Sequence, residues 1–281
     1  MKLRNKTAII TGGSRGIGKI LTKSFLCEGA RVAIAARSEK EISETVQELR
    51  SEGQLIGIPA DVNRKEEVRN LMTRTLAHFD TLDILVNAAG VQGPIGPFIE
   101  INFDEWVSNI QTNLIGTVFC CRSVLPEMIR QKRGKIINFS GGGANNSRPC
   151  FSAYGVSKAA IVRFTEILSD EVKDFHIQVN AVSPGVIKTK MIDEILQAGP
   201  KRAGKEFDLI RSKSSQGFDS PELVSELVCY LASDASDWIT GKVISAVWDP
   251  WREWKDKGPL WLDQDLYVLR RIDQKNFMKK T

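Results

Sequence analysis

The chain has 281 residues, of which 42% are hydrophobic and 26% charged, a composition typical of a soluble globular protein of one or two domains. Its net charge of +5 is small and its Lys and Arg residues are scattered, so we expect no nucleic-acid partner. No apolar run suits a signal peptide or a membrane span, and the five cysteines form no CxxC pair. We therefore expect a cytoplasmic protein with no membrane partner and no metal site.

The first predicted strand leads directly into a glycine-rich turn. Residues 7–11 are a short β-branched run, and Gly12, Gly16 and Gly18 follow as a helical pattern begins. A strand, a glycine turn and a helix in this order form the opening of a dinucleotide-binding unit. The cofactor phosphates are expected at the helix N-terminus, where free N–H groups attract anions. The residues expected to contact the cofactor there are Gly12, Ser14, Arg15, Gly16 and Ile17.

The end of the second predicted strand, 31–36, bears on the choice of cofactor. Sites selective for NAD carry an acidic residue there for the ribose 2′-OH, whereas this chain has Arg37. An arginine can pair with a 2′-phosphate through two parallel hydrogen bonds, and Arg15 offers a second cation nearby. The pattern predicts NADP(H) in preference to NAD(H); the alternative is that both arginines are merely solvated.

Two further strands deliver small or polar residues at their ends. The strand predicted at 54–59 leads to Asp61, which could accept a hydrogen bond from an adenine amino group, cap the next helix, or do both. The strand predicted at 82–86 leads to the segment 87–90, whose small residues allow close approach to a flat ligand. The residues expected at the cofactor from these two strands are Asp61, Val62, Asn87, Ala88 and Gly90.

The alternation of strands and helices continues along the chain. Three more strands are predicted at 135–140, 177–182 and 241–247, and the main helices at 38–52, 103–130, 152–174 and 221–233. Residues 190–219 show a less regular pattern. Because the connections are short, we expect one Rossmann-type, doubly wound α/β domain over residues 1–250, with a seven-stranded parallel sheet covered by helices on both faces. Ligands of such sheets lie beyond the carboxyl ends of the strands.

Tyr154 and Lys158 are four residues apart in a predicted helix and therefore share one face. A nearby ammonium favours the phenolate and lowers the tyrosine pKa from its ordinary value of about 10. Such a pair can move a proton to or from a carbonyl or alcohol oxygen. Asn113 lies within an apolar helical face, where a buried amide needs hydrogen-bond partners, and we expect a break in the helix near it.

Over roughly residues 5–247 the sequence resembles the classical short-chain dehydrogenase/reductase family. The matching motifs, in chain order, are TGGSRGIG at 11–18, Asp61-Val62, NAAG at 87–90, Asn113, Tyr154-x-x-x-Lys158 and PG-x-x-x-T at 184–189. The resemblance implies that Tyr154 is the general acid/base, that Lys158 lowers its pKa and binds the nicotinamide ribose, and that Asn113 holds a water in a proton relay. It also implies cofactor contacts at Asn87, Pro184, Gly185, Val186 and Thr189.

One position departs from the family pattern. The family ends its fifth strand with two serines, and the second polarises the substrate carbonyl; here Ser140 matches the first and Gly141 stands at the second. Strand neighbours face opposite sides, so Ser140 points away from the substrate unless the glycines at 141–143 re-route the backbone. In one interpretation, Ser140, a backbone N–H or a substrate group assists catalysis. In the others, the wider site fits a bulky substrate, or the protein binds NADP and catalyses little.

From these features we expect an NADP(H)-dependent oxidoreductase that interconverts a ketone and a secondary alcohol. The alternative is an NADP-binding protein with weak or no catalysis, acting as a sensor or a partner subunit. The basic residues of 190–219, the expected substrate lid, are either solvated or indicate an anionic substrate, such as a phosphate-bearing sugar or a carrier-bound acyl group.

The C-terminal extension, 251–281, and the residues just before it are rich in tryptophan. Four of the six tryptophans, Trp248, Trp251, Trp254 and Trp261, lie close together there. Because aromatic clusters are rarely left exposed, we expect them to pack on the same domain, at the substrate site, or on a neighbouring subunit. The resemblance further implies a homodimer or homotetramer.

Overall fold

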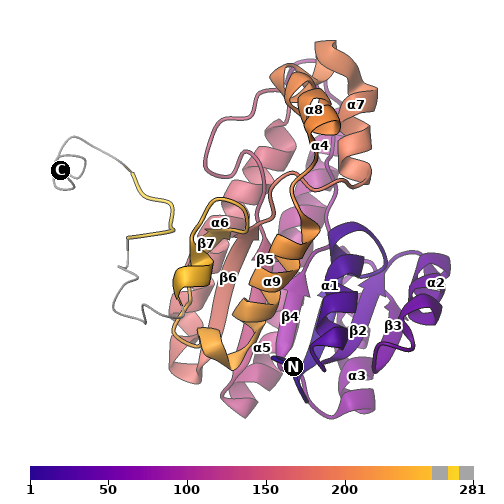
Figure 1. Cartoon of the computed structure of the whole chain (residues 1–281), viewed down its shortest axis with the longest axis vertical. Coiled ribbons are helices and arrows are strands. Elements are labelled where there is room, and N and C mark those ends of the chain that lie inside the picture. The colour runs from indigo at the N-terminus through magenta and orange to yellow at the C-terminus, as the bar shows by residue number, and fades with distance from the viewer. Residues whose placement is uncertain (255–264, 272–281) are drawn as a thin grey trace.

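The computed structural model describes residues 1–254 and 265–271 (Figure 1). Their strands form one parallel sheet in the order β3-β2-β1-β4-β5-β6-β7. The strands are β1 (Thr7–Thr11), β2 (Arg31–Ala36), β3 (Leu55–Pro59), β4 (Ile84–Asn87), β5 (Gly134–Phe139), β6 (Ile177–Ser183) and β7 (Val243–Ser245). The predicted doubly wound, seven-stranded sheet is confirmed.

Helices cover both faces of this sheet. They are α1 (Gly16–Cys27), α2 (Glu39–Leu49), α3 (Lys65–Phe79), α4 (Phe103–Ile110), α5 (Gly116–Gln131), α6 (Ser152–Val172), α7 (Lys190–Ala203), α8 (Lys205–Gln216) and α9 (Pro221–Ala232). The apolar side chains of α1, α2 and α9 share one core cluster, and those of α3, α5 and α6 share a second on the other side of the sheet. Among the described helices, none is both long enough and apolar enough to pass through a membrane.

The apolar strands follow from this two-sided burial. In β1, Ala8 and Ile10 belong to one core cluster, and Ile9, which points to the opposite face, belongs to the other. Every residue of β1 is buried, so the strand reads as a continuous apolar or β-branched run instead of an alternating one. The sheet order reverses between β1 and β4, and the crevice at such a point is where ligands of this architecture bind.

The prediction of irregular structure at 190–219 is wrong, because the segment forms the helices α7 and α8. Gly199, with φ 74°, and Pro200 interrupt α7 and break the apolar period that would have revealed it. Ile192, Ile195 and Ile210 are buried in a small core of their own with Phe151, a residue from the start of α6. In Figure 1 the two helices stand above the sheet, where a lid was expected.

The tryptophan cluster divides into buried and exposed members. Trp254 is fully buried and its ring centroid lies 4.8 Å from that of Tyr267, while the buried Trp251 indole donates to the Ala246 carbonyl. Trp248 is 71% exposed, and Trp261 lies outside the described residues. The Tyr267 carbonyl accepts a hydrogen bond of 2.8 Å from the Val243 N–H, so residues 265–271 run beside β7.

Candidate active site

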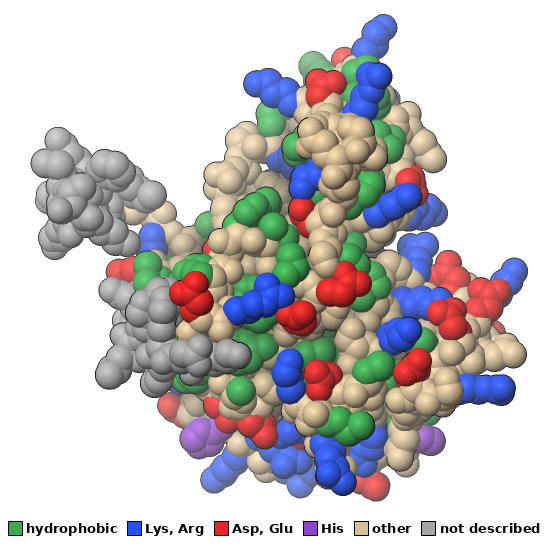
Figure 2. Space-filling view, in the orientation of Figure 1, with side chains coloured by type: hydrophobic (Ala, Val, Ile, Leu, Met, Phe, Trp, Pro, Cys, Tyr) green, Lys and Arg blue, Asp and Glu red, His purple; other side chains and the backbone are tan. Residues whose placement is uncertain are grey.

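A cleft of about 680 Å³ opens at the carboxyl ends of β1, β2 and β4. Its size lies in the range of roughly 300–1,000 Å³ that cofactor and small-molecule sites occupy. The glycine turn forms its floor: a Cβ at Gly18 would lie 2.1 Å from the Gly12 carbonyl oxygen, so only glycine allows helix α1 to begin this close to β1. Figure 2 shows an indentation between the lid and the rest of the body.

Most of the residues predicted at the cofactor line this cleft. They are Gly12, Ser14, Arg15, Gly16, Ile17, Arg37, Asp61, Val62, Ala88, Gly90 and Thr189. The cleft also has lining residues that the sequence did not single out, including Glu41 and, from α7, Met191 and Glu194. Helix α7 therefore forms one wall of the cleft, opposite the glycine turn.

Asn87 lies at the end of β4 but its side chain is engaged away from the cleft. The amide nitrogen donates to Asn138 Oδ1 at 2.9 Å and contacts the Cys121 sulfur at 3.3 Å. Asn138 in turn donates to Thr165 Oγ1 at 2.9 Å, and all these residues are buried. The Asn87 Oδ1 is buried and has no hydrogen-bond partner among the described residues, so only the amide nitrogen is committed to this network.

The segment 184–189 is held in place by Asp219, the last residue of the lid. The Val186 N–H donates to Asp219 Oδ2 at 2.7 Å, and the Asp219 N–H donates back to the Val186 carbonyl. A Cβ at Gly185 would lie 2.7 Å from the same carboxylate oxygen. Of the four residues expected here at the cofactor, Thr189 lines the cleft, whereas Pro184, Gly185 and Val186 do not.

The adenosine end of the cleft carries charges of both signs. Arg15 and Arg37, the two arginines from which a preference for NADP(H) is predicted, are exposed there. The sequence reasoning missed Glu41, whose carboxylate lies 3.8 Å from the Arg15 guanidinium and accepts a hydrogen bond of 3.3 Å from Ser14. The sequence does contain a pattern that marks Glu41: Ser38-x-x-Glu41 is a capping box, typical of the start of a helix. In the structure the Ser38 hydroxyl accepts a hydrogen bond from the Glu41 N–H at the start of α2.

Asp61 does not cap helix α3, whose N-cap residue is Arg64 and which has no side-chain cap; it holds the turn before the helix instead. One carboxylate oxygen accepts a hydrogen bond of 3.0 Å from the Asn63 N–H, which fixes the turn before α3. The Asp61 N–H donates to Glu67 at 2.7 Å, so the turn is held from both sides. Asp61 also lines the cleft and thus presents its carboxylate near the place predicted for an adenine.

Tyr154 and Lys158 lie side by side on α6, beneath the lid. The Lys158 Nζ is 5.5 Å from the centroid of the tyrosine ring and donates to the Phe139 carbonyl at 2.8 Å. Lys158 is only 6% exposed, and this burial lowers its pKa from the ordinary 10.5 to about 8. Burial raises the pKa of Tyr154, and the nearby Arg148 guanidinium opposes that rise.

Asn113 reaches the same place through an irregular turn. Residues Gln111–Ile115 form one π-helical turn between α4 and α5, in agreement with the expected break. The Asn113 amide closes two hydrogen bonds of 2.9 Å with the backbone of Val91 and donates to Ser157 at 3.2 Å. An extra residue in a helical turn re-aims side chains and is common at functional sites. Here it directs a buried amide toward the loop that ends the cleft.

Gly141 faces the reactive tyrosine. A Cβ built on Gly141 would lie 2.6 Å from the Tyr154 hydroxyl, so the hydroxyl fills the space where a side chain at 141 would stand. Ser140, its neighbour at the end of β5, is buried, and its N–H donates to the Val182 carbonyl. The direction of the Gly141 Cβ shows that position 141 points at the tyrosine hydroxyl.

Lys158 permits a test of its buried position through pH. In the unfolded chain its pKa is the ordinary 10.5, whereas in the folded protein it is about 8. Between these values the unfolded chain binds the extra proton, so the wild-type free energy of unfolding gains a contribution that grows as the pH rises from about 8 to 10.5. We expect the difference in unfolding free energy between wild type and Lys158→Met to move in favour of wild type over that range in urea titrations.

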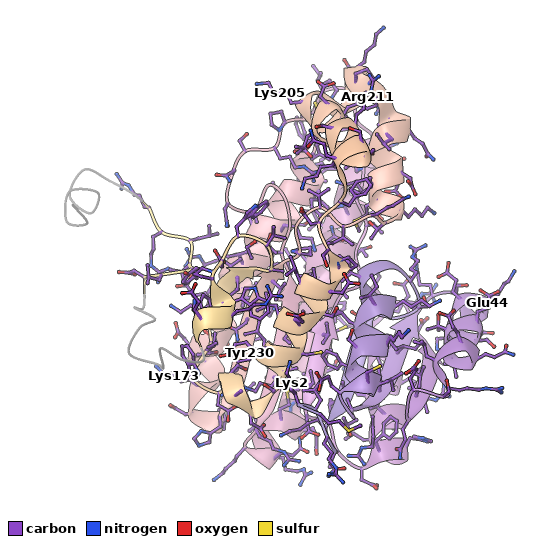
Figure 3. All side chains as sticks on the ribbon, viewed as in Figure 1. Lys2, Glu44, Lys173, Lys205, Arg211 and Tyr230 are labelled. Carbon is purple, nitrogen blue, oxygen red and sulfur yellow. The ribbon has the colours of Figure 1, made fainter. Side chains whose placement is uncertain are left out.

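The control for this measurement is Lys173→Met, because Lys173 is exposed at the far end of α6 (Figure 3). Its difference from wild type should stay constant with pH. A constant difference for Lys158→Met as well would show that the Lys158 ammonium is solvated in the folded protein, contrary to the geometry described above.

Comparison with known proteins identifies the family of the chain. A family model described as short chain dehydrogenase matches residues 6–199. The chain is 34% identical over 248 residues to a diacetyl reductase, (S)-acetoin forming, of Staphylococcus epidermidis, covering 85% of this chain and 96% of the relative. It is 32% identical over 245 residues to dehydrogenase/reductase SDR family member 4 of Caenorhabditis elegans, covering 86% and 94%.

A solved structure gives the same result. An actinorhodin polyketide ketoreductase variant with NADPH superposes with a TM-score of 0.79 at 28% identity, covering 85% of this chain and 95% of that one. The chain therefore belongs to the short-chain dehydrogenase/reductase family of NAD(P)-dependent oxidoreductases.

Proposed function

We propose that the protein is an NADP(H)-dependent oxidoreductase that interconverts a ketone and a secondary alcohol at Tyr154. One observation carries the proposal: Gly90 belongs to the lining of the cleft and also lies beside Asn113 and Lys158, which are proposed to take part in proton transfer. Gly90 lines the cleft, and a Cβ there would lie 3.2 Å from Asn113 Oδ1 and 3.9 Å from Lys158 Nζ. A flat group at this end of the cleft would therefore lie against both residues.

The residues present fit the family cofactor. The glycine turn and the start of α1 suit its phosphates, Asp61 and Ala88 its adenosine, and Gly90 with Lys158 its nicotinamide ribose. When bound, the cofactor supplies or accepts the hydride. Tyr154 donates a proton to the substrate oxygen in reduction and takes it back in oxidation, while Lys158 stabilises the phenolate form. The lid excludes water from this transfer by covering Tyr154.

A cofactor-binding protein with little turnover is the second candidate, and two observations favour it. Position 141 supplies no hydroxyl to polarise a carbonyl, and the Met191 methyl lies 3.9 Å from the Cβ position of Gly90, where the cofactor would end. Removing one donor of this kind in other enzymes commonly costs about 10²–10³ in rate, so the expected consequence is slower turnover and not its loss.

The direct test measures NADPH oxidation with a panel of ketones, by wild type and Tyr154→Phe. We expect turnover by wild type and a loss of about 10²–10⁴ in kcat for the variant, because the proton donor is gone. NADPH binding, followed by fluorescence, should survive the substitution. Tyr230→Phe is the matched control, since Tyr230 lies on α9, low on the body in Figure 3. NADPH binding without turnover, the same for all three proteins, would establish the second candidate instead.

The preference for NADP(H) is also part of the proposal and rests on Arg37 and Arg15. Arg37→Asp should weaken NADPH binding about tenfold or more relative to NADH, because a hydrogen bond to a charged group is worth about 1.5–3 kcal/mol. Glu41→Gln should have the opposite effect, since it frees Arg15 and Ser14 from a competing carboxylate. Fluorescence titrations with both cofactors measure these changes. An unchanged NADPH affinity in Arg37→Asp would contradict the assignment.

The exposed basic residues of the lid do not support the expectation that the substrate is an anion. Lys205 and Arg211 lie at the outer end of the lid in Figure 3, and both are exposed. Lys213 pairs with Asp219 at 2.6 Å, and Arg202 donates its Nε–H to the Ile95 carbonyl. A substrate anion must therefore be recognised by a cation closer to Tyr154.

A further inference from the structure

Arg148 is a half-buried cation beside the reactive tyrosine. Its Cζ lies 5.5 Å from the centroid of the Tyr154 ring and 4.0 Å from that of the Phe151 ring, and its side chain is only 12% exposed. Its Cδ, Cζ and Nε each lie 3.5 Å from the place where a Cβ on Gly142 would be. The guanidinium thus lies between the glycine run and the aromatic rings.

The hydrogen bonding of this guanidinium is incomplete. One terminal N–H donates to Glu206 Oε2 at 2.9 Å, and this carboxylate, 24% exposed, belongs to α8 of the lid. The Arg148 Nε is buried and has no hydrogen-bond partner among the described residues. A buried N–H donor is costly when it has no acceptor, and an arginine side chain has five N–H donors. The site therefore has unused capacity to bind an acceptor, next to Tyr154.

We propose that Arg148 binds the carboxylate of a substrate whose reacting ketone lies beside that carboxylate, and that Glu206 occupies the arginine when no substrate is bound. The proposal rests on the proposed function for the reaction itself, and names the substrate class. A guanidinium binds a carboxylate through two parallel hydrogen bonds, which fixes orientation as well as charge. Such a contact would hold the ketone against Tyr154 at the position where Gly141 supplies no hydroxyl.

The competing explanation is that Arg148 and Glu206 only fasten the lid to the body. The two explanations predict opposite effects for one substitution. If the pair is only a fastening, Glu206→Gln and Arg148→Met both loosen the lid and both weaken ligand binding. If Glu206 holds the place of a substrate carboxylate, Glu206→Gln removes a competitor and strengthens the binding of acids, whereas Arg148→Met weakens it.

The experiment compares two ketones that differ in charge, benzoylformate and its methyl ester. Calorimetry measures their binding with NADP⁺ present and absent; the oxidised cofactor cannot reduce a ketone, so the result does not depend on turnover. We expect wild type to prefer the acid by about tenfold or more, as a charge-assisted pair would give. Arg148→Met should lower the affinity for the acid by about thirtyfold or more and leave the ester nearly unchanged.

Three further variants sharpen the result. Glu206→Gln should bind the acid more tightly than wild type, and Arg148→Lys should recover part of the affinity lost in Arg148→Met. Arg202→Met, which alters an arginine of the lid itself, should leave the preference for acid over ester unchanged. Thermal melts show whether each variant is folded. If Arg148→Met is not folded, the effect of Glu206→Gln on acid binding still decides between the two explanations.

Equal binding of acid and ester by wild type, or no binding of either, would overturn the proposal. So would weaker acid binding by both Arg148→Met and Glu206→Gln. Failure of the proposed function gives a different result: the acid binds through Arg148 as expected, but NADPH is not oxidised when it replaces NADP⁺. Binding and turnover thus test the two proposals separately.

Discussion

The active site depends on how closely helix α6 packs along the carboxyl end of β5 and the glycine run that follows. The contacts, in order from the strand into the loop, join Asn138 to Thr165, Phe139 to Lys158, Gly141 to Tyr154 and Gly143 to Gly155. From Asn138 to Gly141, each later residue meets an earlier residue of the helix, so the two segments run in opposite directions. The Tyr154 hydroxyl and the Lys158 ammonium therefore lie against the backbone of this segment, at Gly141 and Phe139.

This packing leaves no room for a side chain at 141. With the helix so close, any Cβ at 141 would displace the Tyr154 hydroxyl, which lies 2.6 Å from that position. On the proposed function, Tyr154 then acts as the proton donor without a second hydroxyl from position 141. A substrate that brings its own orienting group, bound by Arg148, would compensate for that loss. The two unusual features of the loop, its glycines and its buried arginine, then have one explanation.

Much of the fold could be predicted from the sequence, because two-sided burial leaves apolar strands that are easy to recognise. The glycine turn, Asp61, Gly90, Asn113 and the Tyr154–Lys158 pair follow strands or lie on helices, so their positions near one edge of the sheet follow from the topology. The lid was different. Its glycines and proline interrupt the helical period, and its apolar side chains share a small core with Ile95, Phe151 and Tyr154 that is separate from the two cores on the faces of the sheet.

The contacts that sequence reasoning missed come from side chains whose direction no periodic pattern sets. Glu41 belongs to a recognisable capping box, yet its carboxylate turns toward Ser14 and Arg15. Asn87 is at the predicted place, but a neighbouring strand provides Asn138 as its partner. Arg148 lies in a loop between glycines and a helix, where the sequence gives no indication of burial. Only the packing of the loop against Tyr154 and α8 reveals that this charge is part of the site.

The central claim is that position 141 faces the reacting carbonyl and that the protein catalyses its reaction without a hydroxyl there. Comparing kcat/KM for Gly141→Ser and Gly141→Ala tests it most directly, because both add the same Cβ beside Tyr154 and only the serine adds a donor. We predict that alanine falls below wild type and that serine exceeds alanine by about tenfold or more, as one well-placed donor can contribute. Equal rates for serine and alanine would show that position 141 does not face the substrate.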